Sequence, residues 1–477
     1  MWLRRKSVTF DTANARGHDI KYDILILGAG VAGLAAGRLL AEGGRQVAIV
    51  EARDRVGGRI ATGHVSIGGA LNSIPIELGA EFVHGLPKSS WQLIDEAHLT
   101  TYELGGDHLC YERGRLQDCL ELEYESDSDP TSVLEEMMGW LAVQPPGTDV
   151  TFTNYLDIAG IERKRGQQAA AYVESFNAAD ANVIGVAALA QQQRAENAIQ
   201  ADRLFRIRAG YDAVPKFLRE RFERAGGSVL AGRRVTHVRW SPSGVGVCGT
   251  DARGAAFEFQ ANQAVITLPL GVLQSGSVEF QPPPRDILLH AGRMAVGAVL
   301  RVSLLFDSKF WIDPAISSRP NETARRFGDF SFLFAREEVF PTWWTSMPDP
   351  APLLTAWIGG PKALVLDRSI RSRADPFAIR NECLSELAKI FELSPQALEK
   401  RLISWHEHDW QSDEYARGAY SYAPAGARDA AERMTVPIDD RLFFAGEHTD
   451  VEGHWGTVHG ALASGKRAAL QVMSARA

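Results

Sequence analysis

The chain has 477 residues, of which 45% are hydrophobic and 23% charged, and 44 of them are glycines. This composition is typical of a soluble globular protein with room for two domains, and it excludes a disordered or fibrous chain. The formal charge of −8, from 51 basic and 59 acidic residues, argues against a nucleic-acid binder.

Residues 1–20 are expected to be a disordered leader, because charged residues stand where a secretory signal needs an apolar run. No apolar stretch reaches the roughly 18–20 residues that span a bilayer, so we expect no membrane association. The four cysteines, Cys110, Cys119, Cys248 and Cys383, show neither CxxC spacing nor metal-type partners. We therefore expect no metal site, no disulfide framework and a reducing, cytoplasmic compartment.

The first clear elements are two strands that flank a helix. Tyr22–Leu27 is a short apolar run typical of a buried parallel strand, and Gly28-Ala-Gly30-Val-Ala-Gly33 follows it directly. A helix with an apolar face then runs to Gly43-Gly44, and Gln46–Glu51 is the second strand. This order predicts a complete βαβ unit.

The glycine spacing in this unit fits a dinucleotide. Gly28 permits a tight turn, Gly30 lets the backbone approach a pyrophosphate, and Gly33 allows close packing of helix and strand. Glu51, eighteen residues beyond Gly33, can accept hydrogen bonds from ribose hydroxyls. A glycine turn without a ligand is the alternative, and the flanking strand and helix argue against it.

Residues 88–205 have a different character. Ala/Gln-rich helical periodicity, interrupted at Pro145-Pro146-Gly147, predicts an inserted helical region. The acidic stretch between Asp118 and Glu136 is interpreted as a solvated loop, in preference to a lip that attracts polycations.

Strand and helix patterns continue to the C-terminus. Alternating valines and the run Ala264–Leu268 indicate that the dinucleotide domain resumes after residue 206. The later elements are strands at Leu300–Phe306 and Leu353–Ile358, a helix at Asn381–Phe391, a strand at Arg441–Phe444 and a helix at Thr457–Val472.

The segment from Glu51 to Arg59, Glu-Ala-Arg-Asp-Arg-Val-Gly-Gly-Arg, resembles the extended glycine-arginine motif of the flavin-containing amine oxidase superfamily. The resemblance implies that Arg59 reaches the FAD pyrophosphate, with Arg53 and Gly58 also at the cofactor. A guanidinium group offers a rigid fork of donors that suits phosphate oxygens. An ordinary surface arginine is the alternative for Arg59.

Two further segments extend the resemblance. Glu77–Gly85 looks like the family segment beside the flavin ring, which implies that Gly79, Ala80 and Glu81 lie there. Phe444–Thr449 and Thr457–Ala461 are similar to the second FAD signature of polyamine oxidases and lysine-specific histone demethylases. The cofactor-binding residues implied in this half of the chain are Val235, Trp410, Gly446, Glu447, Thr457 and Val458.

The stretch Trp410–Tyr422 resembles the family segment that carries a tryptophan and an aromatic wall of the substrate cavity, and Tyr420 matches the wall. Core packing is the alternative for Tyr420. Thr457 stands where many members have the partner tyrosine. His84 is either a buried structural histidine or a substrate-facing hydrogen-bonding group, and we count it, with Glu81, Trp410 and Thr457, among the candidate catalytic residues.

Two positions depart from the family pattern. Members that bind flavin covalently have a cysteine before the wall tyrosine, where this chain has Ala419, so FAD should be held non-covalently. Arg301 stands where amine oxidases commonly have a lysine bridged through water to flavin N5, and this puts fast reaction with oxygen in doubt. The alternative is that Arg301 turns away into a salt bridge.

We therefore expect an α/β fold, in which a Rossmann-like FAD-binding domain is interleaved with an α+β substrate-binding domain. The expected FAD-binding segments are 21–87, 206–285 and 401–477, and the expected substrate-domain segments are 88–205 and 286–400. The expected activity is oxidation of a C–N bond of a small amine or polyamine by hydride transfer to flavin N5, with O2 as acceptor and H2O2 as product. The alternatives are a flavin dehydrogenase or desaturase with another acceptor, and a flavin-binding protein without turnover. The sequence does not indicate the oligomeric state.

Overall fold

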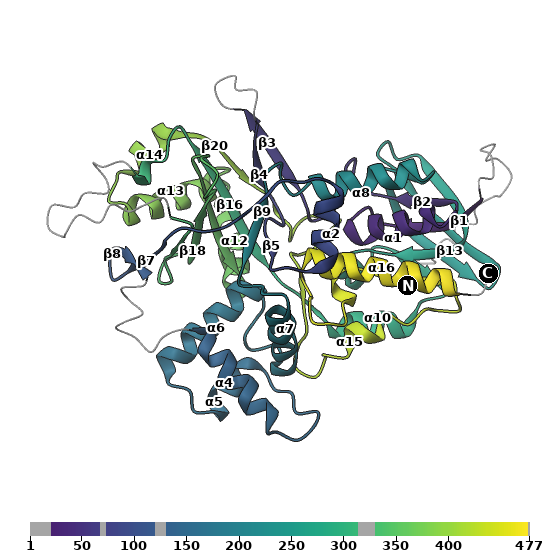
Figure 1. The fold of residues 1–477 in the computed structure, drawn as a ribbon, viewed down its shortest axis with the longest axis horizontal. Coiled ribbons are helices and arrows are strands. Elements are labelled where there is room, and N and C mark those ends of the chain that lie inside the picture. Colours follow the sequence, from purple (N-terminus) through teal and green to yellow (C-terminus); the bar gives the residue numbers. More distant parts are fainter. Residues whose placement is uncertain (1–20, 67–72, 120–129, 313–329, 476–477) are drawn as a thin grey trace, which may run out of the picture.

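The protein is described by a computed structural model that covers residues 21–66, 73–119, 130–312 and 330–475. The expected leader and residues 120–129 of the acidic stretch lie outside these ranges. Figure 1 shows one unit around α1 and α16, a second unit around β16 and α13, and a group of helices around α4 to α7. The first contains the predicted dinucleotide-binding βαβ motif, and we call it the nucleotide-binding unit.

The nucleotide-binding unit is built on an eight-stranded sheet. Its parallel strands are β10 (Ser228–Leu230), β2 (Val47–Val50), β1 (Lys21–Leu27), β13 (Ala256–Ile266) and β22 (Leu442–Phe444). On the other side of β13, β12 (Gly244–Asp251) is antiparallel to both β13 and β11 (Arg233–Ser241), and β14 (Glu279–Gln281) ends the order.

Both faces of this sheet are buried, because successive side chains of a strand point to opposite faces. In β1, Ile24 and Ile26 join one apolar core, and Leu25 and Leu27 join another. The first core is closed by α1 (Val31–Glu42), α16 (Val458–Ser474), α8 (Ala213–Arg224) and α2 (Lys88–Glu96). The second is covered by α9 (Leu270–Ser275), α10 (Arg285–Arg293) and α15 (Ala430–Arg433).

The second unit is a mixed seven-stranded sheet. Its order is β20 (Leu402–Glu407), β16 (Val299–Phe306), β19 (Leu353–Gly359), β18 (Thr342–Thr345), β17 (Phe332–Phe334), β7 (His108–Glu112) and β8 (Arg115–Asp118). Every residue of β16 is buried. Helices α12 (Pro361–Arg371), α13 (Ala378–Ile390) and α14 (Pro395–Arg401) complete its apolar core.

The helical unit has its own apolar core, formed by α4 (Pro130–Ala142), α5 (Phe152–Ile158), α6 (Arg163–Asn177) and α7 (Val186–Ala198). The predicted break at residues 145–147 falls between α4 and α5. Small sheets join the units: β5 (Val83–His84) with β9 (Leu204–Ile207) and β6 (Thr101–Glu103), β3 (Thr62–Ser66) with β4 (Ser73–Glu77), and β15 (Ala295–Val296) with β21 (Ser421–Tyr422).

Three expectations need correction. Residues 88–205 are not helical throughout, because β7 and β8 extend the seven-stranded sheet and α2 packs against α16. The strand β20, expected in the last FAD-binding segment, instead pairs with β16. Cys110 and Cys119 form a disulfide that sequence spacing did not indicate, because the β7–β8 hairpin brings their Cα atoms to 5.0 Å.

Among the helices formed by the described residues, none is both long and apolar enough to cross a membrane.

Candidate active site

The glycine loop between β1 and α1 has the geometry of a phosphate-binding turn. A Cβ atom added at Gly33 would lie 2.0 Å from the carbonyl oxygen of Gly28, so only glycine fits there. A Cβ atom at Gly30 would meet nothing within 4 Å, and Gly30 caps the amino end of α1. The loop therefore presents an open approach to the positive end of the helix dipole.

Glu51 lies beside this loop at the end of β2 and braces it. Its two carboxylate oxygens accept hydrogen bonds from the backbone N–H of Ala29 at 2.7 Å and of Arg53 at 2.8 Å. Burial raises the pKa of the Glu51 carboxyl despite these two donors. Each oxygen keeps a second lone pair, so the carboxylate can still accept from a ribose hydroxyl.

The second glycine turn, at residues 57–59, lies against the first. Gly57 forms an isolated parallel β-bridge with Gly30, and the N–H of Gly57 donates to the carbonyl oxygen of Ala29 at 2.8 Å. A Cβ atom at Gly58 would lie 3.4 Å from the Cα atom of Gly30. The turn directs Arg59 away from β1 and toward the last third of the chain.

Arg59 links three segments that are far apart in the sequence. Its Nη1 donates to Glu447 Oε1 at 2.9 Å and to the carbonyl oxygen of Ala419 at 2.6 Å. Glu447 Oε2 also accepts from Ser421 Oγ at 2.6 Å and from the N–H of Gly456 at 2.8 Å. Burial alone would raise the pKa of Glu447, but the charge of Arg59 lowers it below its ordinary value, so the pair is ionic.

The segment at residues 78–80 packs tightly on the same turn. A Cβ atom at Gly79 would lie 1.9 Å from the carbonyl oxygen of Arg59, and the N–H of Ala80 donates to that oxygen at 3.2 Å. The indole N–H of Trp410 donates to the carbonyl oxygen of Leu78 at 2.8 Å. The structure thus brings Arg59, Gly79 and Ala80 together with Trp410 and Glu447, which lie more than 300 residues further along the sequence.

Glu81 is the centre of a buried charged group that we call the Glu81 cluster: Glu81, Arg206, Arg301 and Trp344. One carboxylate oxygen accepts from Arg206 Nε at 2.6 Å, and the other accepts from Arg301 Nη2 at 2.5 Å and from Trp344 Nε1 at 3.0 Å. The side chains of Glu81, Arg206 and Arg301 are each at most 8% exposed. Burial alone would raise the pKa of Glu81, but the two arginine charges lower it.

The remaining bonds of this cluster fix Arg301. Its Nη1 donates to the carbonyl oxygen of Gly79 at 2.8 Å, while its Nε is buried without a partner among the residues that the structure describes. The structure therefore has the salt bridge that was the alternative interpretation of Arg301. The catalytic role of Glu81 stays a prediction, and in the structure both of its carboxylate oxygens are bonded to arginines.

Aromatic side chains from several elements surround His84. We call Phe82, His84, Phe176, Phe332 and Trp344 the aromatic cluster. The ring centroid of His84 lies 6.2 Å from that of Phe82 and 6.1 Å from that of Phe176. The ring centroid of Phe82 lies 5.6 Å from that of Trp344 and 6.2 Å from that of Phe332. Burial lowers the pKa of His84 to about 4, so its imidazole is neutral at physiological pH.

Tyr420 connects the aromatic cluster to the Arg59–Glu447 pair. Its hydroxyl donates to the carbonyl oxygen of Phe176 at 2.9 Å, and burial raises its pKa. A Cβ atom at Gly456 would lie 2.8 Å from the Tyr420 ring, so the ring lies over the loop before Thr457. Thr457 caps α16 by accepting from the N–H of Gly460 at 3.0 Å, which leaves Val458 at the start of the helix.

The profile of the flavin containing amine oxidoreductase family matches residues 31–473. The chain belongs to this family. Relatives with curated names include polyamine oxidase 2 of Arabidopsis thaliana, 27% identical over 94% of this chain and 87% of that protein. Another is lysine-specific histone demethylase 1 homolog 2 of the same plant, 26% identical over 94% of this chain and 58% of its own length.

Solved structures of the family share the fold. A putrescine oxidase with bound putrescine superposes with a TM-score of 0.75, at 22% identity over 95% of this chain and 99% of that one. The cyclohexylamine oxidase from Brevibacterium oxydans gives a TM-score of 0.74, at 21% identity over 95% and 98% of the two chains. The predicted fold, an FAD-binding domain combined with a substrate domain, is confirmed.

The residues of this family member fit FAD. Gly30 leaves open space at a helix amino end, Glu51 lies where a ribose hydroxyl can reach it, and Arg59 follows the glycine turn that packs on Gly30. Arg53 has a different partner, since its side chain binds Asp413 at 2.7 Å. The role of Val235 in cofactor binding stays a prediction: the residue lies on β11, whose Arg233 N–H donates to the carbonyl oxygen of Glu51 at 2.8 Å.

Sequence reasoning missed Arg206, Phe176 and Asp413. Arg206 carried a usable signal, because it is a charged residue within the apolar strand Leu204-Phe205-Arg206-Ile207, where a buried ion pair is the usual reason. Asp413 accepts from His408 at 2.7 Å, and the His408 ring lies 4.1 Å from that of Trp410. Neither Asp413 nor Phe176 lies in a pattern that indicates its partner.

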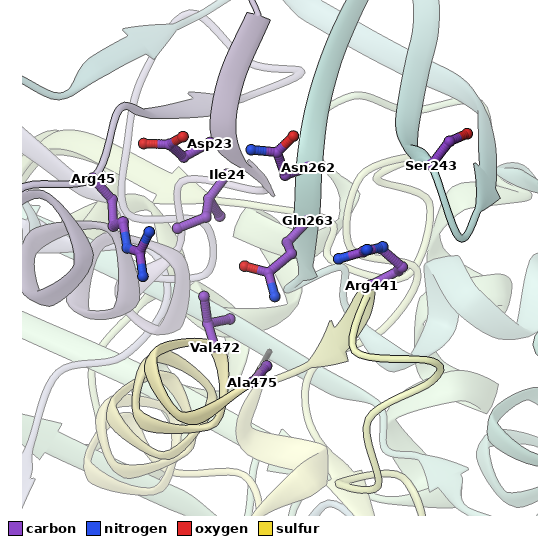
Figure 2. A pocket seen from close by; sticks show the side chains of 9 residues that line it. All are labelled: Asp23, Ile24, Arg45, Ser243, Asn262, Gln263, Arg441, Val472 and Ala475. Carbon is purple, nitrogen blue, oxygen red and sulfur yellow. The ribbon is translucent and has the colours of Figure 1, made fainter. Parts of the chain in front are cut away.

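A separate pocket of about 160 Å³ lies at the opposite edge of the eight-stranded sheet (Figure 2). It is lined by the first half of β1, by the second half of β13 where it pairs with β1, and by the end of α16, with side chains that include Asp23, Arg45, Asn262, Gln263 and Arg441. Ligands of parallel sheets bind at the carboxyl ends of the strands. The pocket contains none of the predicted site residues and is too small for a dinucleotide.

Proposed function

We propose that this chain is an FAD-dependent amine oxidase that holds its flavin non-covalently and oxidises a C–N bond of a small amine. The observation that supports this most directly is the contact between two sites. The Arg59–Glu447 pair of the nucleotide-binding unit is bonded to Ala419 and Ser421. Tyr420, which lies between those two residues, donates a hydrogen bond to Phe176 of the aromatic cluster.

The residues of the site divide into two groups by task. Glu51, Arg59 and the glycine loop would hold the cofactor, and when bound, FAD supplies the acceptor for the hydride lost by the substrate carbon. Tyr420 presents an aromatic face that orients the amine, and neutral His84 offers a hydrogen-bond partner without added charge. The buried aromatic surroundings favour the neutral amine over the ammonium ion. Loss of the hydride from the neutral amine leaves an iminium ion, and this ion or the imine formed when it releases a proton is hydrolysed by water to a carbonyl compound and an amine or ammonia.

The test is anaerobic mixing of the purified yellow holoenzyme with monoamines, polyamines and amino acids, followed by absorbance of the flavin. At least one amine should bleach the flavin, and acid treatment should release FAD from the polypeptide, since Ala419 cannot form a thioether. Tyr420→Ala should slow flavin reduction far more than it lowers FAD content. Flavin that remains with the denatured chain, or no bleaching by any amine, would contradict the proposal.

We propose O2 as the electron acceptor, with H2O2 as the product. The second candidate is a dehydrogenase that uses another acceptor, and the buried Arg301 favours it, because Arg301 is fixed by Glu81 and cannot hold a single water as a lysine can. Reoxidation of the reduced enzyme by oxygen, followed by stopped-flow absorbance in wild type and Arg301→Lys, separates the two. A faster reaction only in the lysine variant would favour the dehydrogenase.

A further inference from the structure

We propose that this site selects a monoamine with an apolar or aromatic substituent over diamines and polyamines. The inference rests on the proposed function and deepens it by naming the substrate class. It follows from two features of the described residues: the aromatic cluster, and the way in which the carboxylates near it are already paired.

The aromatic cluster provides an apolar surface from four different elements. Phe82 and His84 come from β5 and the residue before it, Phe176 from α6, Phe332 from β17 and Trp344 from β18. On the solvent side, the rings of Tyr172 and Phe176 are stacked with centroids 5.7 Å apart and planes 7° apart. Rings in edge-to-face and stacked arrangements favour a hydrocarbon or aryl group that enters between them.

The carboxylate that contacts the aromatic cluster cannot serve as a counter-ion for a second ammonium group. Glu81 shares Trp344 with the cluster, but both of its oxygens are bonded to Arg206 and Arg301. Two guanidinium groups against one carboxylate leave an excess of positive charge in the Glu81 cluster. A second ammonium at this position would therefore be repelled.

The carboxylates of the neighbouring helices give little compensation. Helices α6 and α7 carry one carboxylate each, Glu174 and Glu196, and burial raises the pKa of both, that of Glu196 to about 7. Glu196 is also bonded to Gln192 at 2.7 Å. Both groups therefore resist ionisation where a dication would need a full negative charge.

These features set the expected discrimination. A monoamine loses its proton, places its nitrogen at Tyr420 and buries its substituent against the rings. A diamine of the same length must desolvate a second ammonium group without an available counter-ion. We expect flavin reduction by hexylamine, 2-phenylethylamine or benzylamine to be roughly 10- to 100-fold more efficient than by hexane-1,6-diamine or spermidine.

The experiment measures the rate and substrate dependence of anaerobic flavin reduction in the holoenzyme. Hexylamine and hexane-1,6-diamine form the matched pair, since they differ only in the second amino group. Binding without turnover is measured by perturbation of the oxidised flavin spectrum with tert-octylamine, which has no hydrogen on the carbon that bears nitrogen. This second measurement reports on amine binding at the aromatic cluster even if reduction of the flavin is slow.

A pair of variants tests the cause. Phe176→Glu adds a carboxylate to the aromatic cluster at a residue that is 39% exposed, so it should raise the efficiency with hexane-1,6-diamine relative to hexylamine by about tenfold. Phe176→Gln is the control with the same shape and no charge, and it should leave the ratio unchanged.

The inference is overturned if hexane-1,6-diamine or spermidine reduces the wild-type flavin as well as hexylamine does. In that case, loss of the polyamine activity in Glu196→Gln would identify Glu196 as the counter-ion. If no amine reduces the flavin and tert-octylamine does not perturb its spectrum, the proposed function fails together with the inference, whereas a polyamine preference would overturn only the inference.

Discussion

At the scale of single residues, the Glu81 cluster shows how strongly one buried carboxylate can constrain a site. Glu81 forms ion pairs with two arginines from different strands, and the three charged side chains are almost completely shielded from water. Buried ion pairs add little net stability when they are intact, but removal of one partner leaves an uncompensated charge. We therefore expect Glu81 to be needed for the stability of the fold around it.

We expect Glu81→Gln to lower the free energy of unfolding by roughly 3–5 kcal/mol, because Arg206 and Arg301 would both lose their buried anion. Denaturant unfolding followed by fluorescence measures this change. The control is Glu103→Gln, which removes a carboxylate bonded to Arg203 at 2.7 and 2.8 Å on the protein surface. Equal effects of the two variants would show that burial of the pair is not what matters.

His448 gives a residue-scale prediction about pH. It lies 1% exposed beside Gly446, and burial lowers its pKa to about 4 from the ordinary value of 6.5. Between pH 6.5 and 4 the unfolded chain therefore binds a proton that the folded chain does not, so stability is complete above this window and falls as the pH is lowered through it.

Replacement by an uncharged residue, His448→Gln, should remove up to about 1.4 kcal/mol per pH unit from the slope of stability against pH in this window. Unfolding at several pH values between 4 and 7 measures the slope. The exposed histidine variant His237→Gln is the control and should leave it unchanged. A wild-type slope in the His448 variant would mean that other groups cause the acid sensitivity.

At the scale of elements, α16 is placed by its contact with α1. A Cβ atom at Gly465 would lie 2.2 Å from the carbonyl oxygen of Ala32, so the two helices touch backbone to backbone. This contact holds α16 against α1 at the glycine loop and so fixes the helix that begins at Val458 after its cap Thr457. The position of the last FAD signature thus depends on a glycine that lies inside a helix.

Gly465→Ala should lower the free energy of unfolding by about 1–3 kcal/mol or more, because the two helices must separate to make room for the methyl group. Gly139→Ala in α4 is the matched control: nothing lies within 4 Å of the added Cβ atom, and alanine favours helix by about 0.5–1 kcal/mol. Thermal unfolding and FAD content of both variants measure the effect. A stable Gly465→Ala protein with full FAD content would show that α16 can shift without loss of the site.

The element scale also shows where sequence patterns were sufficient. The strand β1 and the helix α1 were predicted almost to the residue, since a continuous apolar run, three glycines and a glycine pair mark their ends. The strands β7 and β8 were missed, because short strands at the edge of a sheet have no strong periodicity of their own. The strand β17, which pairs with β7, lies more than 200 residues further along the chain.

At the scale of the whole molecule, the predicted cofactor site is assembled from distant parts of the chain. Arg59 of the first predicted FAD-binding segment meets Ala419 and Glu447 of the last in one group of hydrogen bonds. A ligand that contacts both segments stabilises their assembly by mass action. The stability of the protein should therefore depend on FAD.

We expect FAD at about 100 times its dissociation constant to stabilise the folded apoprotein by about 2.7 kcal/mol, with a corresponding rise in Tm. Glu51→Ala should weaken FAD binding by about 1–3 kcal/mol and reduce this rise. Calorimetric titration of the apoprotein and thermal unfolding with and without FAD measure both effects. If Glu51→Ala binds FAD as tightly as wild type, another residue holds the ribose.

The sequence by itself determined the family, the βαβ unit and the residues of the glycine loop, because these depend on local backbone geometry and on short-range patterns. It also identified Tyr420 and His84 as residues worth examining. It did not determine the contacts of Glu81 and Arg301. Two further residues bonded to Glu81 are placed by the sheets: Arg206 by the pairing of β9 with β5 and β6, and Trp344 by the seven-stranded sheet. Which charged groups pair in a buried site depends on which strands become neighbours. Only the tertiary structure decides this, because the free energy of packing is shared among many residues that lie far apart in the sequence.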